Sequence, residues 1–521
     1  MELMKKSKKV EQLKASTLVQ LPIETDINIS DSKPDAKEVI YDRAVAKLEE
    51  VKAGTNKVWI KGKISYQILY STQKEKREIA CMTGEIPFME ELYLDDVEPQ
   101  DVVLCNVRLD TCQIKLINSR KWNFMAKLLL QPKVQVTTEE SFCVDMVQNG
   151  EELPQKPVLE YQKNNFSYLE NVVSKKDLLR IHEEVRIPGN YGCADEVDWK
   201  SIEVKNVVFQ MFQEKMVAHG ELQLFLSYTE DGNDTRYHYD LTIPFSQTLP
   251  CQECQEDMLA DVAYTVAHED ISIKENEDGQ NSLVVVELAL ELEMKLWKRD
   301  NVELISGVYG INCEVAAQTN QVHFMKLYKT DTMTETISGK AAYEQPVIQI
   351  LHDSVKVEVD QCEVQENEIV IRGNVYHNTF LQRQEEKETY GQQKAAIPFT
   401  VTYQLAGAGK GMFCKAVPNV TDNKTSWKED GFIEYMTDMS FYIFVLETCE
   451  ENSVSEVAVS MIDQKKQDAL PGIMVHVVQK GDTLWNLGRE YYMSIDMLKE
   501  VNGLTSDVLE PGEKLILMKM V

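Results

Sequence analysis

The chain has 521 residues, which is too long for one hydrophobic core, so several domains are expected. A composition of 43% hydrophobic and 27% charged residues is that of folded protein. The formal net charge of −30 argues against nucleic acid, anionic lipid and anionic wall polymer as electrostatic partners.

The amino-terminal segment is polar and contains a cluster of lysines. No apolar stretch of the kind found in signal peptides follows it. A membrane span would require about 18 consecutive apolar residues without charges, and the sequence contains no such run. We therefore predict a mobile tail over residues 1–20 and a protein that stays in the cytoplasm, with no membrane span.

One pattern occurs three times between residues 21 and 449. Each copy has an alternating apolar strand with a glycine at its centre and, after a nearly constant interval, the triplet Ile-Pro-Phe. The three copies are Gly62 with residues 86–88, Gly220 with residues 243–245, and Gly373 with residues 397–399. Agreement at three places indicates internal duplication.

Each copy has the sequence features of antiparallel β-structure. The central glycine predicts a bulge or bend, and the proline of the triplet is expected to end its strand because it has no N–H to donate. Leu288–Leu296 alternates apolar with mostly charged residues, as in a strand with one buried face. We predict a mainly β fold with three tandem β-rich domains over residues 21–177, 178–342 and 343–449, each a sandwich or a curled antiparallel sheet.

These copies resemble the SPOCS domain, a repeat of unknown biochemical activity in spore-forming Firmicutes. The resemblance rests on a Lys-Pro-Asp lead-in, a strand of the V-x-V-x-G type and the Ile-Pro-Phe triplet. The first copy matches best because Lys33-Pro34-Asp35 precedes Gly62. The second and third copies keep the glycine and the triplet but lack the lead-in.

A polar, poorly periodic segment over residues 450–473 predicts a tether to a last domain at residues 474–521. The pattern of this domain predicts the order strand, helix, helix, strand. Asp482 and Ser494 are placed to cap the two helices. Asn502-Gly503 supplies a left-handed stop for the second helix.

The last domain resembles the LysM module, because Gly481 to Trp485 reads Gly-Asp-Thr-Leu-Trp. There are two departures: His476 stands where a tyrosine is common, and Gly488 stands where an alanine is usual. In the LysM family an N-acetylated sugar lies in a shallow groove between this loop and the loop after the second helix. The matching positions are Gly481, Asp482, Thr483 and Leu484 on one side, and Asn502, Gly503, Leu504 and Leu509 on the other.

Each groove position also has a purely structural explanation. A structural role alone would explain each of them: Asp482 as a helix cap, Leu484 as a core residue and Gly481 as a turn residue. Trp485 is a large aromatic residue just after a helix cap in a small domain. It is equally compatible with core packing and with a contact to a partner.

Eleven cysteines are dispersed along the chain, and Cys251 and Cys254 form the one C-x-x-C motif. In a chain without an export signal they predict reduced core thiols. A zinc site would need a second pair or nearby histidines, and a redox motif would need a thioredoxin-like context. The sequence has no G-x-S-x-G, H-E-x-x-H or EF-hand pattern. We therefore expect no metal, no other cofactor and no catalytic site.

Three SPOCS-like repeats followed by one LysM domain resemble the arrangement of SipL-like spore-coat morphogenetic proteins. The resemblance implies a non-enzymatic scaffold of the mother cell that gathers at the forespore surface. It would bind the basement-layer ATPase of the coat, with the LysM domain contributing to that protein contact. Two other hypotheses stay open. The LysM domain could hold peptidoglycan or another N-acetylated glycan at the cortex or wall, although single LysM modules usually bind weakly. The β repeats could also contain an uncharacterised enzyme.

Overall fold

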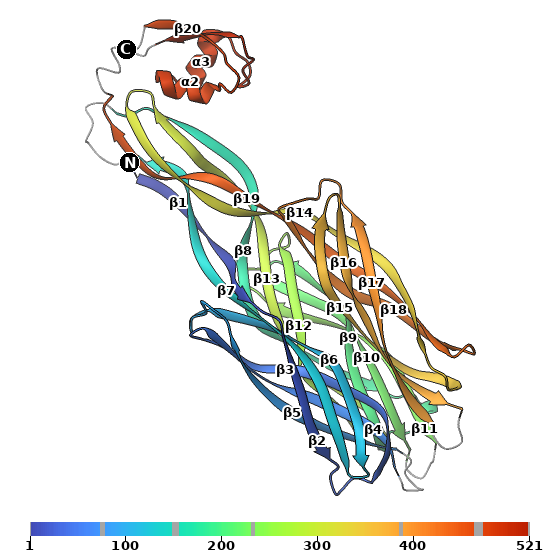
Figure 1. Ribbon diagram of the computed structural model, residues 1–521. Helices are drawn as coiled ribbons and strands as arrows, with labels where there is room; N and C mark the ends of the chain where they lie inside the picture. Colours follow the sequence, from blue (N-terminus) through green and yellow to red (C-terminus); the bar gives the residue numbers. More distant parts are fainter. Residues whose placement is uncertain are drawn as a thin grey trace.

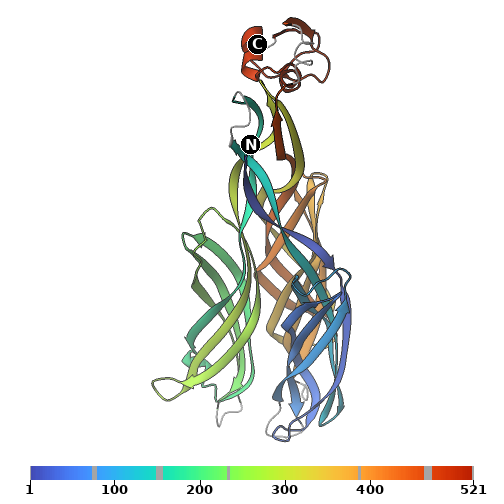
Figure 2. The same cartoon turned by 90° about the vertical axis from the view of Figure 1, so that its left-hand side faces the viewer.

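The computed structural model describes residues 2–72, 79–147, 156–230, 235–384, 389–462 and 472–518. Three elongated β-rich lobes lie side by side, and a narrow stalk rises from them to a small head (Figure 1, Figure 2). The lobes are the three repeats, and the head is formed by residues 473–518. Within these ranges no helix is long and apolar enough to cross a membrane.

The strands follow one another in the same order in each repeat. The first repeat contains β1 (Glu2–Ser16), β2 (Val19–Asn28), β3 (Ala36–Gly54), β4 (Lys57–Thr72), β5 (Ile79–Tyr93), β6 (Val102–Asn118) and β7 (Lys121–Val147). The second contains β8 (Leu159–Arg186), the 3-10 turn η1 (Gly189–Tyr191), β9 (Glu196–Phe212), β10 (Lys215–Thr229), β11 (Arg236–Pro250), β12 (Leu259–Glu275) and β13 (Asn281–Gly310). The third contains β14 (Glu314–Ala342), β15 (Val347–Gln365), β16 (Glu368–Arg383), β17 (Tyr390–Gln404), β18 (Met412–Lys428) and β19 (Phe432–Ser460). The head contains β20 (Ile473–Val477), α2 (Leu484–Tyr491), α3 (Ile495–Asn502) and β21 (Lys514–Met518).

Each repeat folds as a sandwich of two antiparallel sheets. One sheet is a meander of three consecutive strands, β3-β4-β5, β9-β10-β11 or β15-β16-β17. In the other sheet the last strand of the repeat is central, so that β7, β13 or β19 pairs on both sides. An apolar core fills each sandwich. The predicted mainly β, antiparallel fold is confirmed, and the sandwich is the form it takes.

Strand β1 occupies most of the segment 1–20 that the sequence predicts as a mobile tail, so that prediction is wrong. β1 pairs with the carboxyl-terminal half of β7, and β2 pairs with its amino-terminal half. Together they take the place of β8 and β14 in the other repeats. The charged side chains of β1 suggested a solvated tail, but several of their partners lie on other repeats. Lys6 is hydrogen-bonded to Asp300, and the Lys8 ammonium lies 4.0 Å from the centre of the Phe324 ring.

The same topology shifts the boundaries of the repeats. The boundary predicted at residue 177 falls inside β8, which pairs along its length with β13. The boundary predicted at residue 342 assigns β14 to the second repeat, whereas β14 pairs with β19 of the third. The tether predicted over residues 450–473 begins inside β19, which extends to Ser460. Residues 463–471 of that tether lie outside the described ranges.

The glycine and the phenylalanine of the repeated motif are cross-strand partners. Gly220 of β10 pairs with Phe245 of β11, and a Cβ atom at Gly220 would lie 2.6 Å from Cζ of that ring. The equivalent pairs are Gly62 with Phe88 and Gly373 with Phe399. Only a residue without a side chain leaves room for the ring, which explains why the two motifs recur together. The predicted bulge lies in the neighbouring strand, opposite or next to each glycine.

The proline of the Ile-Pro-Phe triplet does not end its strand, contrary to the prediction. β5, β11 and β17 continue past Pro87, Pro244 and Pro398. All three are edge strands of their sheets. Proline is tolerated at such an edge because its missing N–H breaks no bond of the ladder.

Two shared clusters join the three repeats into one body. Where the lobes meet, Tyr41, Trp199 and Phe380 come from the first, second and third repeat, and the rings of Tyr41 and Trp199 are 4.8 Å apart. Above them β1, β7, β8, β13, β14 and β19 extend beyond their sandwiches as three paired ribbons and form the stalk (Figure 1). Phe142 and Tyr168 pack around Phe324 inside it, with centroid distances of 5.3 and 5.2 Å. The stalk is therefore a composite of all three repeats.

Cys251 and Cys254 form a disulfide. The prediction of reduced thiols is therefore wrong for this pair. The pair closes a turn in which the Cys254 N–H donates to the Cys251 carbonyl at 3.0 Å. Both residues are buried in the core of the second repeat. The other nine cysteines are free thiols.

Candidate functional site: the head and its contact with the stalk

The head has the predicted order of strand, helix, helix and strand. β20 pairs antiparallel with β21, and the two helices pack on a core that includes Leu484, Leu487, Leu498 and Leu515. Ser494 caps α3 through its side chain, and Gly503 ends that helix in a left-handed conformation. Both predictions are confirmed, because helix capping and the left-handed stop depend on residues within one turn of the chain.

Asp482 closes the loop before α2, and Thr483 caps the helix itself. The Thr483 hydroxyl accepts the Asn486 N–H at 3.1 Å, so the cap lies one residue later than predicted. The Asp482 carboxylate instead accepts the Gln479 N–H at 2.8 Å and lies 2.7 Å from Nε2 of His476. The backbone hydrogen bond, followed by the contact with His476, lowers the pKa of Asp482. The unusual His476 is thereby explained as the partner of Asp482.

The loop after α3 is held by the amide of Asn502. Its Nδ2 donates to the carbonyls of Leu498 and Ile516, both at 2.9 Å, and its Oδ1 accepts the Ile516 N–H. The amide therefore ties α3 to β21. This use is structural, because both ends of the amide are engaged within the head.

The two predicted sides of the groove lie over one core. Leu484 is part of the head core, and Leu504 and Leu509 pack against it. Gly481 and Thr483 on one side and Gly503 on the other are exposed to solvent. The structure thus brings both loops of the predicted groove onto the same small domain and leaves Gly481, Thr483 and Gly503 accessible, while Asp482 and Asn502 are engaged within the head.

Trp485 lies against the tip of the stalk rather than in the core of the head. Its indole meets the ring of Tyr309 edge-on, with the centroids 4.7 Å apart. A Cβ atom at Gly307 would lie 3.0 Å from Cζ2 of the indole, so the β13 backbone approaches the ring closely. This half-buried contact joins α2 to β13.

Two hydrogen bonds complete the contact between head and stalk. The Tyr309 hydroxyl donates to the Met493 carbonyl at 2.8 Å in a buried position. The Tyr492 hydroxyl donates to Glu314 Oε1 at 3.3 Å. Burial, together with the nearby Glu160, raises the pKa of Tyr309, which keeps the hydroxyl protonated as a donor.

Sequence reasoning missed the stalk residues of this contact, although one signal pointed to it. Gly488, which departs from the alanine usual in LysM modules, faces the stalk. A Cβ atom there would lie 2.3 Å from the Tyr309 hydroxyl oxygen. The smaller residue makes room for a side chain of another domain, which no pattern inside the head could identify.

Comparison with family models identifies both parts of the chain. The SipL, SPOCS domain model matches residues 21–117, 194–274 and 346–428, which together make up half of the chain. The chain belongs to this family. The LysM domain model matches residues 476–517. A comparison with solved structures finds no significant match.

The three SPOCS matches cover only part of each repeat. The SPOCS matches end before β7, β13 and β19 begin, so the long strands at the centre of the second sheets and of the stalk lie outside them.

SipL membership indicates a sporulation protein, and a LysM domain is associated with glycan binding. Neither matched domain family is catalytic. Among the residues with described positions, no group of three or more His, Cys, Asp or Glu side chains could hold a metal ion.

Proposed function

We propose that this protein is a non-enzymatic scaffold of spore coat assembly that docks to the basement-layer ATPase of the coat at the forespore surface of the mother cell. In this proposal the three SPOCS repeats form the body, and the LysM head contributes the surface that contacts the ATPase. The partner is inferred from the resemblance to SipL-like proteins.

The observation that carries the proposal is the seated position of the head. Tyr309 and Glu314 of the stalk hold α2 and the turn after it through two hydrogen bonds and an aromatic contact. The stalk contains strands from all three repeats. The head is therefore joined to the body by its contacts with β13 and β14 as well as by the chain that leads to it. A head held in one orientation suits a scaffold that must present a surface in a defined direction.

A second candidate function, binding of peptidoglycan or another N-acetylated glycan, is favoured by the exposure of the groove loops. Gly481, Thr483 and Gly503 are all accessible. Backbone amides in such loops can meet an acetamide group, while an apolar floor receives its methyl group. The net charge of −30 opposes this function at an anionic wall.

One experiment with the full-length chain separates the two functions. Thr483→Asp keeps a good helix cap but places a carboxylate in the predicted groove, and Asn486→Asp adds the same charge on the exposed side of α2 as a matched control. Wild type and both variants are tested against purified coat basement-layer ATPase and against insoluble peptidoglycan. The proposal expects binding to the ATPase, weakened by at least about tenfold in Thr483→Asp but not in the control. Retention by peptidoglycan without ATPase binding would overturn it.

A further inference from the structure

One side of the third sandwich is closed by two strands that belong to different sheets. β15 is the edge strand of the sheet β15-β16-β17, and β18 is an edge strand of the sheet that contains β14 and β19. The two edges lie side by side. Since these strands are not paired in a ladder within the described ranges, side chains hold them together. We call this line of contact the β15–β18 seam.

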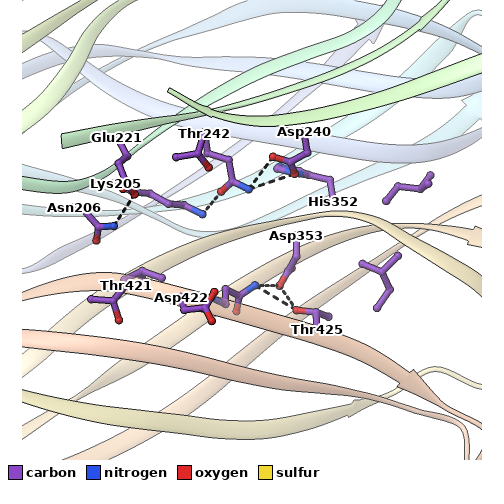
Figure 3. A pocket seen from close by; sticks show the side chains of 15 residues that line it. Lys205, Asn206, Glu221, Asp240, Thr242, His352, Asp353, Thr421, Asp422 and Thr425 are labelled. Carbon is purple, nitrogen blue, oxygen red and sulfur yellow. Dashed lines mark hydrogen bonds and ion pairs between the residues drawn. The ribbon is translucent and has the colours of Figure 1, made fainter. Parts of the chain in front are cut away.

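One end of the seam is held by the buried carboxylate of Asp353. It accepts hydrogen bonds from Thr425 at 2.6 Å and from Asn423 at 2.9 Å, both on β18 (Figure 3). Here the seam borders a polar cavity of about 320 Å³ that faces the second repeat, where Oδ2 of Asp240 lies 3.0 Å from Nδ1 of His352. Hydrogen bonds to a charged acceptor are stronger than those between neutral groups, so this end is firmly held.

The other end of the seam contains two thiols. Cys362 lies near the end of β15, and Cys414 lies near the start of β18. Both are free, half-buried and packed against the core of the third repeat. The Cys362 thiol is hydrogen-bonded to the sulfur of Cys414. Because an S–H group is a weak donor, this end is held less firmly than the end at Asp353.

The first and second repeats have apolar side chains where the third has the two thiols. Counted from the repeat glycine and from the Ile-Pro-Phe triplet, the two positions are Val51 and Val103 in the first repeat and Phe209 and Ala260 in the second. All four pack against the cores of their own sandwiches. The fold therefore needs only apolar packing at this place, and the thiols of the third repeat add chemistry that packing does not require.

The hydrogen bond between the thiols makes them chemically unequal. It lowers the pKa of Cys414, against the opposing effects of burial and of Glu363. It also raises the pKa of Cys362. The thiolate is the nucleophilic form of cysteine, so Cys414 is the more reactive thiol of the pair. Its neighbour Cys362 is placed to attack the Cys414 sulfur in a second step.

We propose that Cys362 and Cys414 form a reversible disulfide that fastens the weaker end of the β15–β18 seam. The oxidant is a low-molecular-weight disulfide such as glutathione disulfide. The site involves no residue of the head, so it goes beyond the function proposed above.

The reaction is two successive thiol–disulfide exchanges. The Cys414 thiolate attacks one sulfur of the oxidant, forms a mixed disulfide and releases the first small thiolate. Cys362 loses its proton to solvent and attacks the Cys414 sulfur, which forms the S–S bond within the chain and releases the second small thiolate. Two protein thiols are thereby oxidised to one disulfide, and one molecule of the oxidant is reduced to two thiols.

The test uses the full-length protein, reduced and then exposed to glutathione disulfide under native conditions. Remaining thiols are blocked with N-ethylmaleimide, and the chain is cut with trypsin. Cleavage at lysine and arginine gives peptides 357–372 and 411–415, which mass spectrometry finds joined only if the bond has formed. The Cys251–Cys254 disulfide re-forms as an internal standard. We expect the joined peptides to form at least about tenfold faster than any other new disulfide, because the two sulfurs are already in contact.

Cysteine variants assign the two roles. In Cys362→Ser the hydroxyl can still donate to Cys414, and the reaction should stop at the mixed disulfide of Cys414 with glutathione. In Cys414→Ser the remaining thiol should carry at least about tenfold less glutathione, since it is the less acidic of the two. Cys105→Ser removes a half-buried thiol of the first repeat and should leave the yield of joined peptides unchanged. Circular dichroism confirms that each variant is folded.

The disulfide should also stabilise the third sandwich. On oxidation, the thermal unfolding temperature should rise by roughly 5 °C more in wild type than in either Cys362→Ser or Cys414→Ser, and dithiothreitol should reverse the difference. If the joined peptides form no faster than other cysteine pairs, or no faster in the folded chain than in urea, the proposal is wrong.

Discussion

Tyr309 of the stalk and Trp485 of the head meet edge-to-face, with ring centroids 4.7 Å apart. The same tyrosine donates its hydroxyl to the Met493 carbonyl. A residue near the end of the second repeat therefore sets the position of a domain that follows the third. This contact accounts for Trp485 without any external partner, and four predictions follow from it and from the packing of the repeats.

Tyr309→Phe should loosen the head without unfolding it. The variant keeps the aromatic contact but leaves the buried Met493 carbonyl without its donor, which costs about 1 kcal/mol. Hydrogen exchange followed by mass spectrometry should show faster exchange in peptides that cover α2 and the tip of β13. Peptides from the three sandwiches should exchange as in wild type. Unchanged protection of α2 would mean that the hydroxyl contributes nothing to holding the head.

Gly488→Ala should detach the head from the stalk. The added Cβ would lie 2.3 Å from the Tyr309 hydroxyl oxygen, so one of the two surfaces must move. Small-angle X-ray scattering should report a broader distribution of head positions and a larger maximum dimension. Combining the change with Tyr309→Phe removes the closer of the two oxygens that the added Cβ would meet, the other being the Met493 carbonyl at 2.8 Å. The double variant should therefore be less affected than the sum of the singles. Asn486→Ala, on the exposed side of the same helix, serves as the control.

Gly220→Ala should destabilise the second repeat by about 1–3 kcal/mol, because the new methyl group overpacks against the Phe245 ring. The Cβ would lie 2.6 Å from Cζ of that ring. Urea unfolding measures the loss. Gly189→Ala is the matched control in the same repeat, since no atom lies within 4 Å of its added Cβ. Equal stability of the two variants would show that the ring moves aside at little cost.

His238 should make the body less stable as the pH falls from about 6.5 to 4. Burial, reinforced by Arg236, lowers the pKa of this histidine to about 4. In the unfolded chain the imidazole has a pKa of about 6.5, so the unfolded state takes up its proton first. The stability present above pH 6.5 is therefore lost progressively as the pH approaches 4, and its loss amounts to about 3 kcal/mol.

Chemical unfolding of wild type and His238→Gln across this pH range tests the prediction. The variant should show a shallower decline with acid, because residue 238 no longer titrates. His182→Gln, which removes an exposed histidine of the same repeat, should decline as wild type does. A parallel decline of wild type and His238→Gln would contradict the assignment.

The sequence by itself determined the features that depend on neighbouring residues or on recurrence. The glycine and Ile-Pro-Phe motifs revealed three β-rich units because the Gly–Phe cross-strand pair is required in every copy. Ser494 and Gly503 marked the ends of α3 because capping and a left-handed stop act within one turn. The LysM pattern located the two loops of the predicted groove for the same local reason.

Only the tertiary structure decided which elements meet across long distances. Alternation along a strand shows which face is buried but not which strand lies beside it. The charged residues of β1 therefore predict a tail, because the sequence does not reveal their partners on other repeats. The cavity with Asp240 and His352, and the seat of Trp485 against Tyr309, arise from the packing of separate domains. Such contacts join surfaces that are far apart in the chain, so no local periodicity encodes them.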